Sequence, residues 1–318
     1  MKKYAVGIDL GGTMIKYAIV SSDGEIVFEN TCPTPVNGGA GSVIDALARA
    51  VADCVSKARS EGLKLEGVGI GTPGVVSSDG RRVIGGAENI PGWENIDIAS
   101  GIEKEFRLPV VATNDANAMA YGEFCFGASR DATDVVFITV GTGIGGAVLI
   151  NGSLWRGYES RGMELGHITV KADGDKCACG GYGCLEHYAS TIALIRRYLD
   201  LSGEEVDGRI LVQRYLDGDR LAIQAFGEHW MYLGHGIASI INIFAPQYVV
   251  VGGGISEAGD FYMENLRREA YSRAMDVCSF GTKIIAAELG NKAGCLGAGR
   301  LAIDHCLKST LNKPGELE

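Results

Sequence analysis

The chain has 318 residues, of which 46% are hydrophobic, and its formal net charge is −10. This length suits two folded lobes, and the acidic balance, with no cluster of Lys and Arg, disfavours binding to nucleic acid. No apolar run approaches the ~20 residues of a membrane helix, and Asp9 interrupts the first apolar stretch too early for a signal peptide. We therefore expect a cytoplasmic protein without a membrane segment.

Short apolar, β-branched runs that end at glycines predict the strands. In chain order these are Tyr4–Ile8, Ile15–Val20, Val68–Ile70, Val110–Ala112, Val135–Val140, Ala147–Ile150, Tyr248–Val251 and Ile284–Ala286. Helical spacing of apolar residues predicts one helix over 43–55, with Ser42 as its N-cap, and a longer one over 223–244. Because strands alternate with helices, the predicted class is α/β.

Two stretches follow the same plan. Residues 7–24 and 137–152 each run through a strand, a glycine turn, a second strand and a turn of the Asp-Gly or Asn-Gly type. This echo favours two lobes that hold one phosphate chain between them. We expect an N-terminal lobe over 1–115 and a C-terminal lobe over 116–318, with a terminal helix at about 300–312 that packs back on the first lobe.

Glycine-rich turns after three of the strands are candidates for phosphate binding, since bare backbone N–H groups form an anion-binding concavity. Neither of the first two resembles a P-loop, and the second does not open a helix as a dinucleotide-binding fingerprint does. The alternative is that each is only a tight hairpin. The candidate residues are Asp9, Gly11, Gly12 and Thr13 in the first turn, Thr142 and Gly143 in the second, and Gly254 in the third.

Four residues have the spacing of a closed zinc site. His167, Cys177, Cys179 and Cys184 form the pattern His-x9-Cys-x-Cys-x4-Cys, one imidazole with three thiols. Four protein ligands leave no open position for a reacting water, so the expected role is structural; the alternative is three incidental thiols near a histidine. A metal on one ring nitrogen of His167 leaves the proton on the other, which can donate to a hydroxyl.

Asp115 is the candidate base. It follows a predicted strand and precedes a helical stretch, a position at which an N-cap is more common than a catalyst. A carboxylate at the end of a strand nevertheless suits a kinase, which needs a group to take the proton of the acceptor. Asn89, in the turn Asn89-Ile90-Pro91-Gly92-Trp93, either presents its amide to a polar ligand or belongs to an ordinary turn.

These motifs, with Asn114-Asp115-Ala116-Asn117 and Glu164-x-Gly166-His167, resemble the ROK family of sugar kinases and repressors from residue 4 to about residue 300. The resemblance implies a two-lobed, actin-like (ribonuclease H-like) ATPase fold, with sugar and nucleotide in a cleft between the lobes. It implies ATP, Mg²⁺ and structural Zn²⁺, and a homodimer or homotetramer. It implies that Asp115 is the general base, that Asn89, Asn114, Glu164, His167 and Glu186 contact the sugar, and that Asp9, Gly11, Gly12, Thr13, Thr142 and Gly143 lie on the phosphate and Mg²⁺ side.

Within the family, the zinc motif and the turn at Asn89 are most similar to the glucokinase-type branch, which implies phosphorylation of glucose to glucose 6-phosphate. Kinases for N-acetylmannosamine, allose, mannose or fructose share nearly all of these residues. A sugar-responsive repressor would need a DNA-binding module before the first strand, and a silent sugar binder would not need Asp115. One departure is Met14, where many relatives have Lys or Thr; Lys16 follows, and the sequence leaves its direction open.

Overall fold

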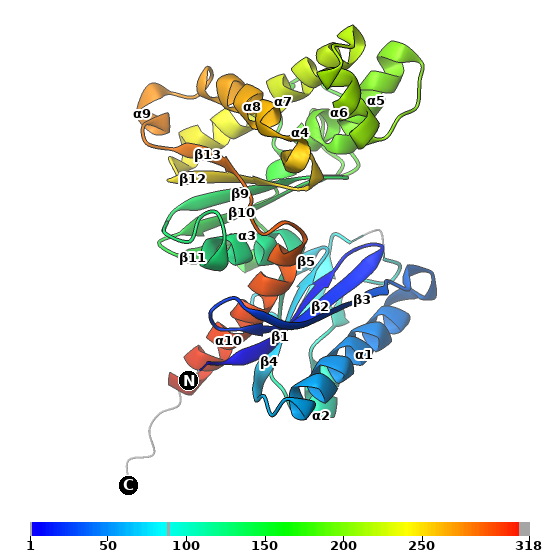
Figure 1. Ribbon diagram of the computed structural model, residues 1–318, viewed down its shortest axis with the longest axis vertical. Helices are drawn as coiled ribbons and strands as arrows, with labels where there is room; N and C mark the ends of the chain where they lie inside the picture. Colours follow the sequence, from blue (N-terminus) through cyan, green and yellow to red (C-terminus); the bar gives the residue numbers. More distant parts are fainter. Residues whose placement is uncertain (1, 88–89, 312–318) are drawn as a thin grey trace. The chain divides into compact units, whose positions relative to one another are not determined.

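The computed structural model describes residues 2–87 and 90–311, which fall into two compact units (Figure 1). Unit 1 takes the chain up to Arg130, the segment Arg156–Gly162 and the residues from Asn291 onwards. Unit 2 takes Asp131–Trp155 and Met163–Gly290. Each unit has its own hydrophobic core.

Unit 1 is built on a five-stranded sheet in the order β3-β2-β1-β4-β8. The strands β1, β2 and β3 are antiparallel neighbours, whereas β1, β4 and β8 are parallel. The sheet strands are β1 (Tyr4–Leu10), β2 (Met14–Ser21), β3 (Ile26–Pro33), β4 (Leu65–Thr72) and β8 (Val110–Asn114). The helices are α1 (Gly39–Ser60), α2 (Ser100–Phe106), α3 (Asp115–Phe126) and α10 (Ala293–Leu311), and a small sheet contains β5 (Val75–Val76), β6 (Arg82–Gly85) and β7 (Ile96–Asp97).

Unit 2 repeats this plan with a sheet in the order β11-β10-β9-β12-β13. As in unit 1, the first two pairs are antiparallel and the last two are parallel. Its strands are β9 (Val135–Val140), β10 (Ile144–Ile150), β11 (Ser153–Trp155), β12 (Tyr248–Gly252) and β13 (Lys283–Ala286). Its helices are α4 (Leu185–Ala189), α5 (Thr191–Ser202), α6 (Gly208–Leu216), α7 (Arg220–Phe244), α8 (Asp260–Tyr271) and α9 (Asp276–Ser279). The predicted two-lobed α/β fold is confirmed.

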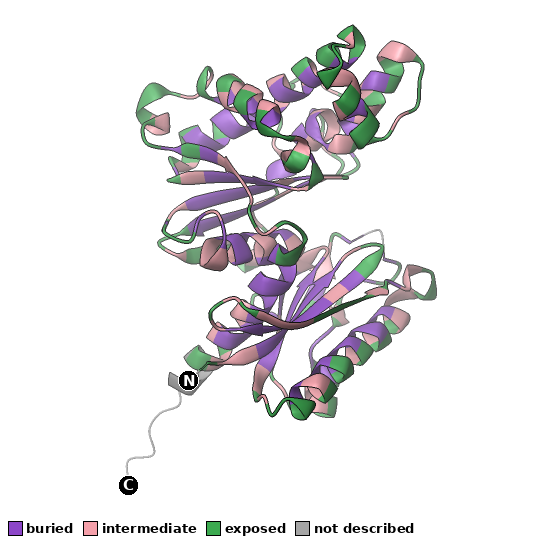
Figure 2. Cartoon of the chain, in the orientation of Figure 1, coloured by how far each residue is buried: buried purple, intermediate pink, exposed green. Residues whose placement is uncertain are grey.

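Successive side chains of β1 point to opposite faces of the sheet. Val6, Ile8 and Leu10 belong to the core that includes residues of α1, while Ala5 packs against residues of α10. The central strands of the sheet are largely buried (Figure 2). On this second face the helix backbone almost touches the sheet, because a Cβ at Gly69 of β4 would lie 1.8 Å from the carbonyl oxygen of Ala298. Glycine is therefore required there, and the close approach brings the first turn of α10 to the end of β1.

The structure corrects one predicted cap and adds strands. Helix α1 begins at Gly39, so Ser42 lies inside it and its hydroxyl donates to the carbonyl oxygen of Gly38. All eight predicted strands are present. The added strand β3 is largely half-buried or exposed, and for that reason it lacks the apolar run that reveals a buried strand.

Helix α3 and helix α10 pack against each other within unit 1. Because α3 belongs to unit 1, the first stretch of unit 1 ends at Arg130, whereas the sequence suggested a boundary between the lobes at residue 115. In the described part of the chain, no helix has both the length and the apolar character needed to cross a membrane.

Candidate active site and metal centre

Two carboxylates of unit 1 lie at one edge of its sheet. Because β1, β4 and β8 are parallel, their carboxyl ends meet at the same edge, where Asp9 pairs with Gly71 and Gly71 with Thr113. Asp115 is the first residue of α3, and a Cβ at Gly71 would lie 3.6 Å from its Cα. Asp9 and Asp115, predicted as the magnesium-side acid and the base, are thus brought to the same edge.

The N-cap of α3 is Asn114, and the interpretation of Asp115 as the cap is wrong. Asn114 Oδ1 accepts from the backbone N–H groups of Ala116 at 2.9 Å and Asn117 at 3.3 Å, and its Nδ2 donates to the carbonyl oxygen of Gly74 at 3.2 Å. Asp115 Oδ1 accepts from the N–H of Ala116 at 2.8 Å. The positive end of the helix dipole interacts favourably with a negative side chain in this first turn.

The first glycine turn is held from outside the hairpin. Gly11 N–H donates to the carbonyl oxygen of Met14, and Thr34 binds two carbonyl oxygens of the turn, those of Gly11 at 2.7 Å and Thr13 at 2.8 Å. A turn whose carbonyl groups are engaged in this way can present its remaining N–H groups to an anion. Gly12 and Thr13 are exposed, so an anion can reach them. Sequence reasoning missed Thr34, because it reaches the turn only through the pairing of β2 with β3.

Asp9 is nearly buried, with 7% of its surface exposed. Burial raises the pKa of its carboxyl group, and the positive charge of Lys16 counteracts this rise. The first turn of α10 lies against it, since a Cβ at Gly294 would be 2.7 Å from Asp9 Cγ. No local signal could have revealed this contact, because the two residues come from opposite ends of the chain.

The second predicted glycine turn, which lies in unit 2, is hydrogen-bonded to the side chain of Glu186. Ile144 N–H donates to Glu186 Oε2 at 2.8 Å, and a Cβ at Gly143 would lie 2.3 Å from the same oxygen. Thr142 is exposed at the tip of this turn. Gly254 is exposed at the neighbouring strand end, following Gly253, whose Cβ would meet the carbonyl oxygen of Val140 at 2.2 Å.

Glu164 precedes a short 3-10 helix, Leu165–His167, whose last residue is His167 and which packs on the same hairpin. A Cβ at Gly166 would lie 2.1 Å from the carbonyl oxygen of Ile144, which explains the glycine. Glu164 is exposed, and its carbonyl oxygen accepts from the N–H of His167 at 3.0 Å. Unit 2 therefore gathers three of the predicted sugar ligands around one hairpin, whereas Asn89 lies outside the described residues.

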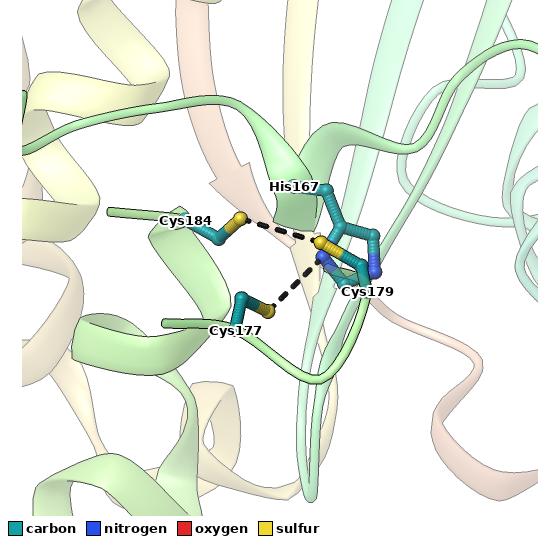
Figure 3. Close-up of side chains that lie close together, drawn as sticks. All are labelled: His167, Cys177, Cys179 and Cys184. Atoms are coloured by element: carbon teal, nitrogen blue, oxygen red, sulfur yellow. Dashed lines mark hydrogen bonds between the residues drawn. The ribbon is translucent and has the colours of Figure 1, made fainter. Parts of the chain in front are cut away.

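His167, Cys177, Cys179 and Cys184 converge as the sequence predicts, with their ligand atoms all within 4.8 Å of one another (Figure 3). The Sγ atoms of Cys179 and Cys184 are 3.6 Å apart, and Cys177 Sγ is 3.7 Å from His167 Nδ1. Tetrahedral zinc has S···S separations of about 3.8 Å and N···S separations of about 3.5 Å, from bond lengths of ~2.3 and ~2.0 Å. The four side chains fit a zinc ion, with Nδ1 of His167 as the nitrogen ligand.

The loop that carries the thiols is tied to itself by backbone bonds. Cys177 N–H donates to the carbonyl oxygen of Gly181 at 2.8 Å, and Gly181 N–H contacts Cys179 Sγ at 3.5 Å. The latter contact lowers the pKa of Cys179, while burial raises that of Cys184 to about 12. A divalent cation at the centre would hold all three thiols as thiolates.

Comparison with known proteins agrees with these features. The model of the ROK family matches residues 5–305. A glucokinase of Streptomyces coelicolor is 34% identical over 316 residues, which cover 93% of this chain and 96% of that protein. The crystal structure of a ROK family glucokinase from Streptomyces griseus, in complex with glucose and AMPPNP, matches with a TM-score of 0.81 at 34% identity and covers 95% of this chain and 99% of that chain. The xylose repressor of Bacillus subtilis is 32% identical over 306 residues, which cover 96% of this chain and 78% of the repressor.

Proposed function

Because the chain belongs to the ROK family, we propose that it is an ATP-dependent hexose kinase that converts glucose to glucose 6-phosphate. The observation that carries this proposal is the match to glucokinases at about one third identity over nearly their whole length. The shared edge at which Asp9 and Asp115 lie supports it, since phosphoryl transfer needs a base for the acceptor and a carboxylate for the metal.

The proposal gives each residue of unit 1 a role. Asp115 takes the proton from the sugar hydroxyl as that oxygen attacks the γ-phosphorus of ATP, and Asn114 contacts the sugar beside it. Asp9 holds the metal side and the N–H groups of Gly12 and Thr13 face the phosphates, while Gly11, whose N–H bonds to Met14, closes the turn. Mg²⁺, when bound, offsets charge on the transferring phosphoryl group.

Unit 2 supplies the remaining contacts in the proposal. Glu164 and Glu186 accept hydrogen bonds from sugar hydroxyls, and Thr142, Gly143 and Gly254 serve the phosphate side. If Nδ1 of His167 is a zinc ligand, its proton lies on Nε2, which then donates to a hydroxyl. Zinc supplies no chemistry here: it fixes the loop that carries His167 and leads into Glu186.

Asn89 also belongs to the proposed sugar contacts, as part of the turn before Trp93. Trp93, four residues further along the chain, donates its Nε1–H to the buried hydroxyl of Thr72 at 2.9 Å. A cytoplasmic location and a homodimer or homotetramer complete the proposal.

A sugar panel tests the identity of the acceptor. We expect ADP release, measured with a coupled assay over glucose, N-acetylmannosamine, allose, mannose and fructose, to give the highest kcat/KM with glucose. A missing or misplaced hydroxyl leaves polar groups of the site covered by the sugar but without partners, and losses of about 10²-fold or more are the expected result. A higher kcat/KM for one of the other sugars would reassign the substrate while retaining the kinase.

The repressor alternative rests on the similarity to the xylose repressor. The kinase is favoured because the glucokinase is the more similar of the two, at 34% against 32% identity, and because Asp9 and Asp115 lie at one edge of the sheet. Specific, salt-sensitive binding to promoter DNA in a gel-shift assay would favour the repressor.

A further inference from the structure

Lys16 is tied to the proposed magnesium ligand in unit 1. Asp9 and Lys16 are directly opposite each other in the β1–β2 pair, so their side chains lie on the same face of the sheet. Lys16 Nζ lies 3.7 Å from Asp9 Oδ2 and donates to Asn291 Oδ1 at 3.2 Å. Asn291 belongs to the turn that leads into α10. The direction that the sequence left open is therefore toward Asp9.

The surroundings of Asp9 explain why it has a cation beside it. An ionised carboxylate with 7% exposure loses most of its hydration, and an opposite charge compensates for that loss. The lysine side chain itself is 34% exposed, so its ammonium group can move without opening the core. Asp9 is fixed between the sheet and α10, whereas Lys16 is free to exchange partners.

We propose that Lys16 is an exchangeable cation that occupies Asp9 before the nucleotide binds and moves to the phosphate oxygens when the metal takes its place. This inference rests on the proposed function, because it requires ATP and a divalent metal at the first glycine turn. The ammonium group and a divalent metal compete for one carboxylate when no phosphate is present. They act together once phosphates supply a second set of oxygens. The free metal therefore binds weakly, and the metal–nucleotide complex binds as a unit.

This exchange gives Lys16→Met two effects of opposite sign. Removing the competing charge should tighten the binding of a free divalent ion at Asp9 by about 10-fold. Removing a charged partner of the phosphates should weaken binding of the metal–nucleotide complex by about 10- to 100-fold. A lysine that only stabilised the fold would lower both affinities together, so the split distinguishes a positioning residue from a structural one.

The experiment measures binding and not turnover. Mn²⁺ replaces Mg²⁺, the unbound ion is counted by electron paramagnetic resonance, and Mn·AMPPNP binding is followed by titration calorimetry. Lys16→Arg keeps a cation and should retain most of the nucleotide affinity. Lys64→Met is the matched control, since its side chain is 85% exposed on the same unit, and it should change neither affinity. Adding Asp9→Asn to Lys16→Met should abolish the gain in Mn²⁺ affinity, which assigns the ion to Asp9.

The outcomes separate the inference from the function. If the unaltered protein binds Mn·AMPPNP and Lys16→Met binds it equally well, or loses affinity for both ligands, the exchange is refuted while the kinase stands. If the unaltered protein binds no Mn·AMPPNP, the proposed function fails and the exchange fails with it. Tighter Mn²⁺ and weaker Mn·AMPPNP in Lys16→Met, with the nucleotide affinity rescued by Lys16→Arg, would support it.

Discussion

Asp115→Asn is expected to lower kcat by about 10²- to 10⁴-fold, the usual contribution of a general base, with little change in the Kd for glucose. Asparagine has the size of aspartate and can still accept from the N–H of Ala116, so helix α3 keeps its first turn. What it cannot do is take the proton of the acceptor hydroxyl. The measurements are steady-state turnover with a coupled ADP assay and glucose binding by calorimetry.

Asp260→Asn is the matched control for this prediction. Asp260 is also the first residue of a helix, α8, and α8 and α3 both contain 12 residues. Asp260 is exposed, so the substitution removes the same charge from the same helical position outside the proposed site. We expect normal turnover from this variant. Near-normal turnover of Asp115→Asn would remove Asp115 from the role of base.

The second large effect concerns the metal centre. Cys184→Ser is expected to lower the free energy of unfolding by more than about 3 kcal/mol and to reduce turnover with it, because loss of a buried ligand releases the loop before Glu186. Zinc content, measured by mass spectrometry, should fall from about one ion per chain to much less. A strong chelator should have the same effects on the unaltered protein.

Cys278→Ser is the control for the thiol itself. Cys278 is half-buried against the core of unit 2 and lies outside the cluster, so its replacement should cost less than about 1 kcal/mol and leave the zinc content unchanged. Should the chelated protein, shown to be free of zinc, melt at the same temperature and turn over at the same rate as untreated protein, the structural role would be lost.

The strands were predictable because most of them are buried. In β1, β9 and β12 the apolar run is itself the core, and each run ends at a glycine turn. The edge strand β3 has no such run, since its side chains are largely half-exposed or exposed. The start of α1 was misplaced because Ser42 has the chemistry of an N-cap, but the helix begins at Gly39, four residues before the predicted start at residue 43.

The site was predictable where its residues are close in sequence. The four zinc ligands come from one short segment, and their spacing alone indicated that they converge. Asp9 and Gly294 could not be grouped in this way, because their contact depends on how closely α10 approaches β1 and β4. Spacing shows which residues share a loop, but only packing shows which helix reaches the loop from elsewhere in the chain.

The central claim is that this chain transfers a phosphoryl group to a sugar hydroxyl, and identification of the products tests it most directly. Purified protein is incubated with glucose and Mg·ATP, and the products are identified by phosphorus NMR. We predict glucose 6-phosphate and ADP in equal amounts, with almost no ADP when the sugar is left out. ADP and inorganic phosphate without any sugar phosphate, or no consumption of ATP with any hexose, would contradict the account.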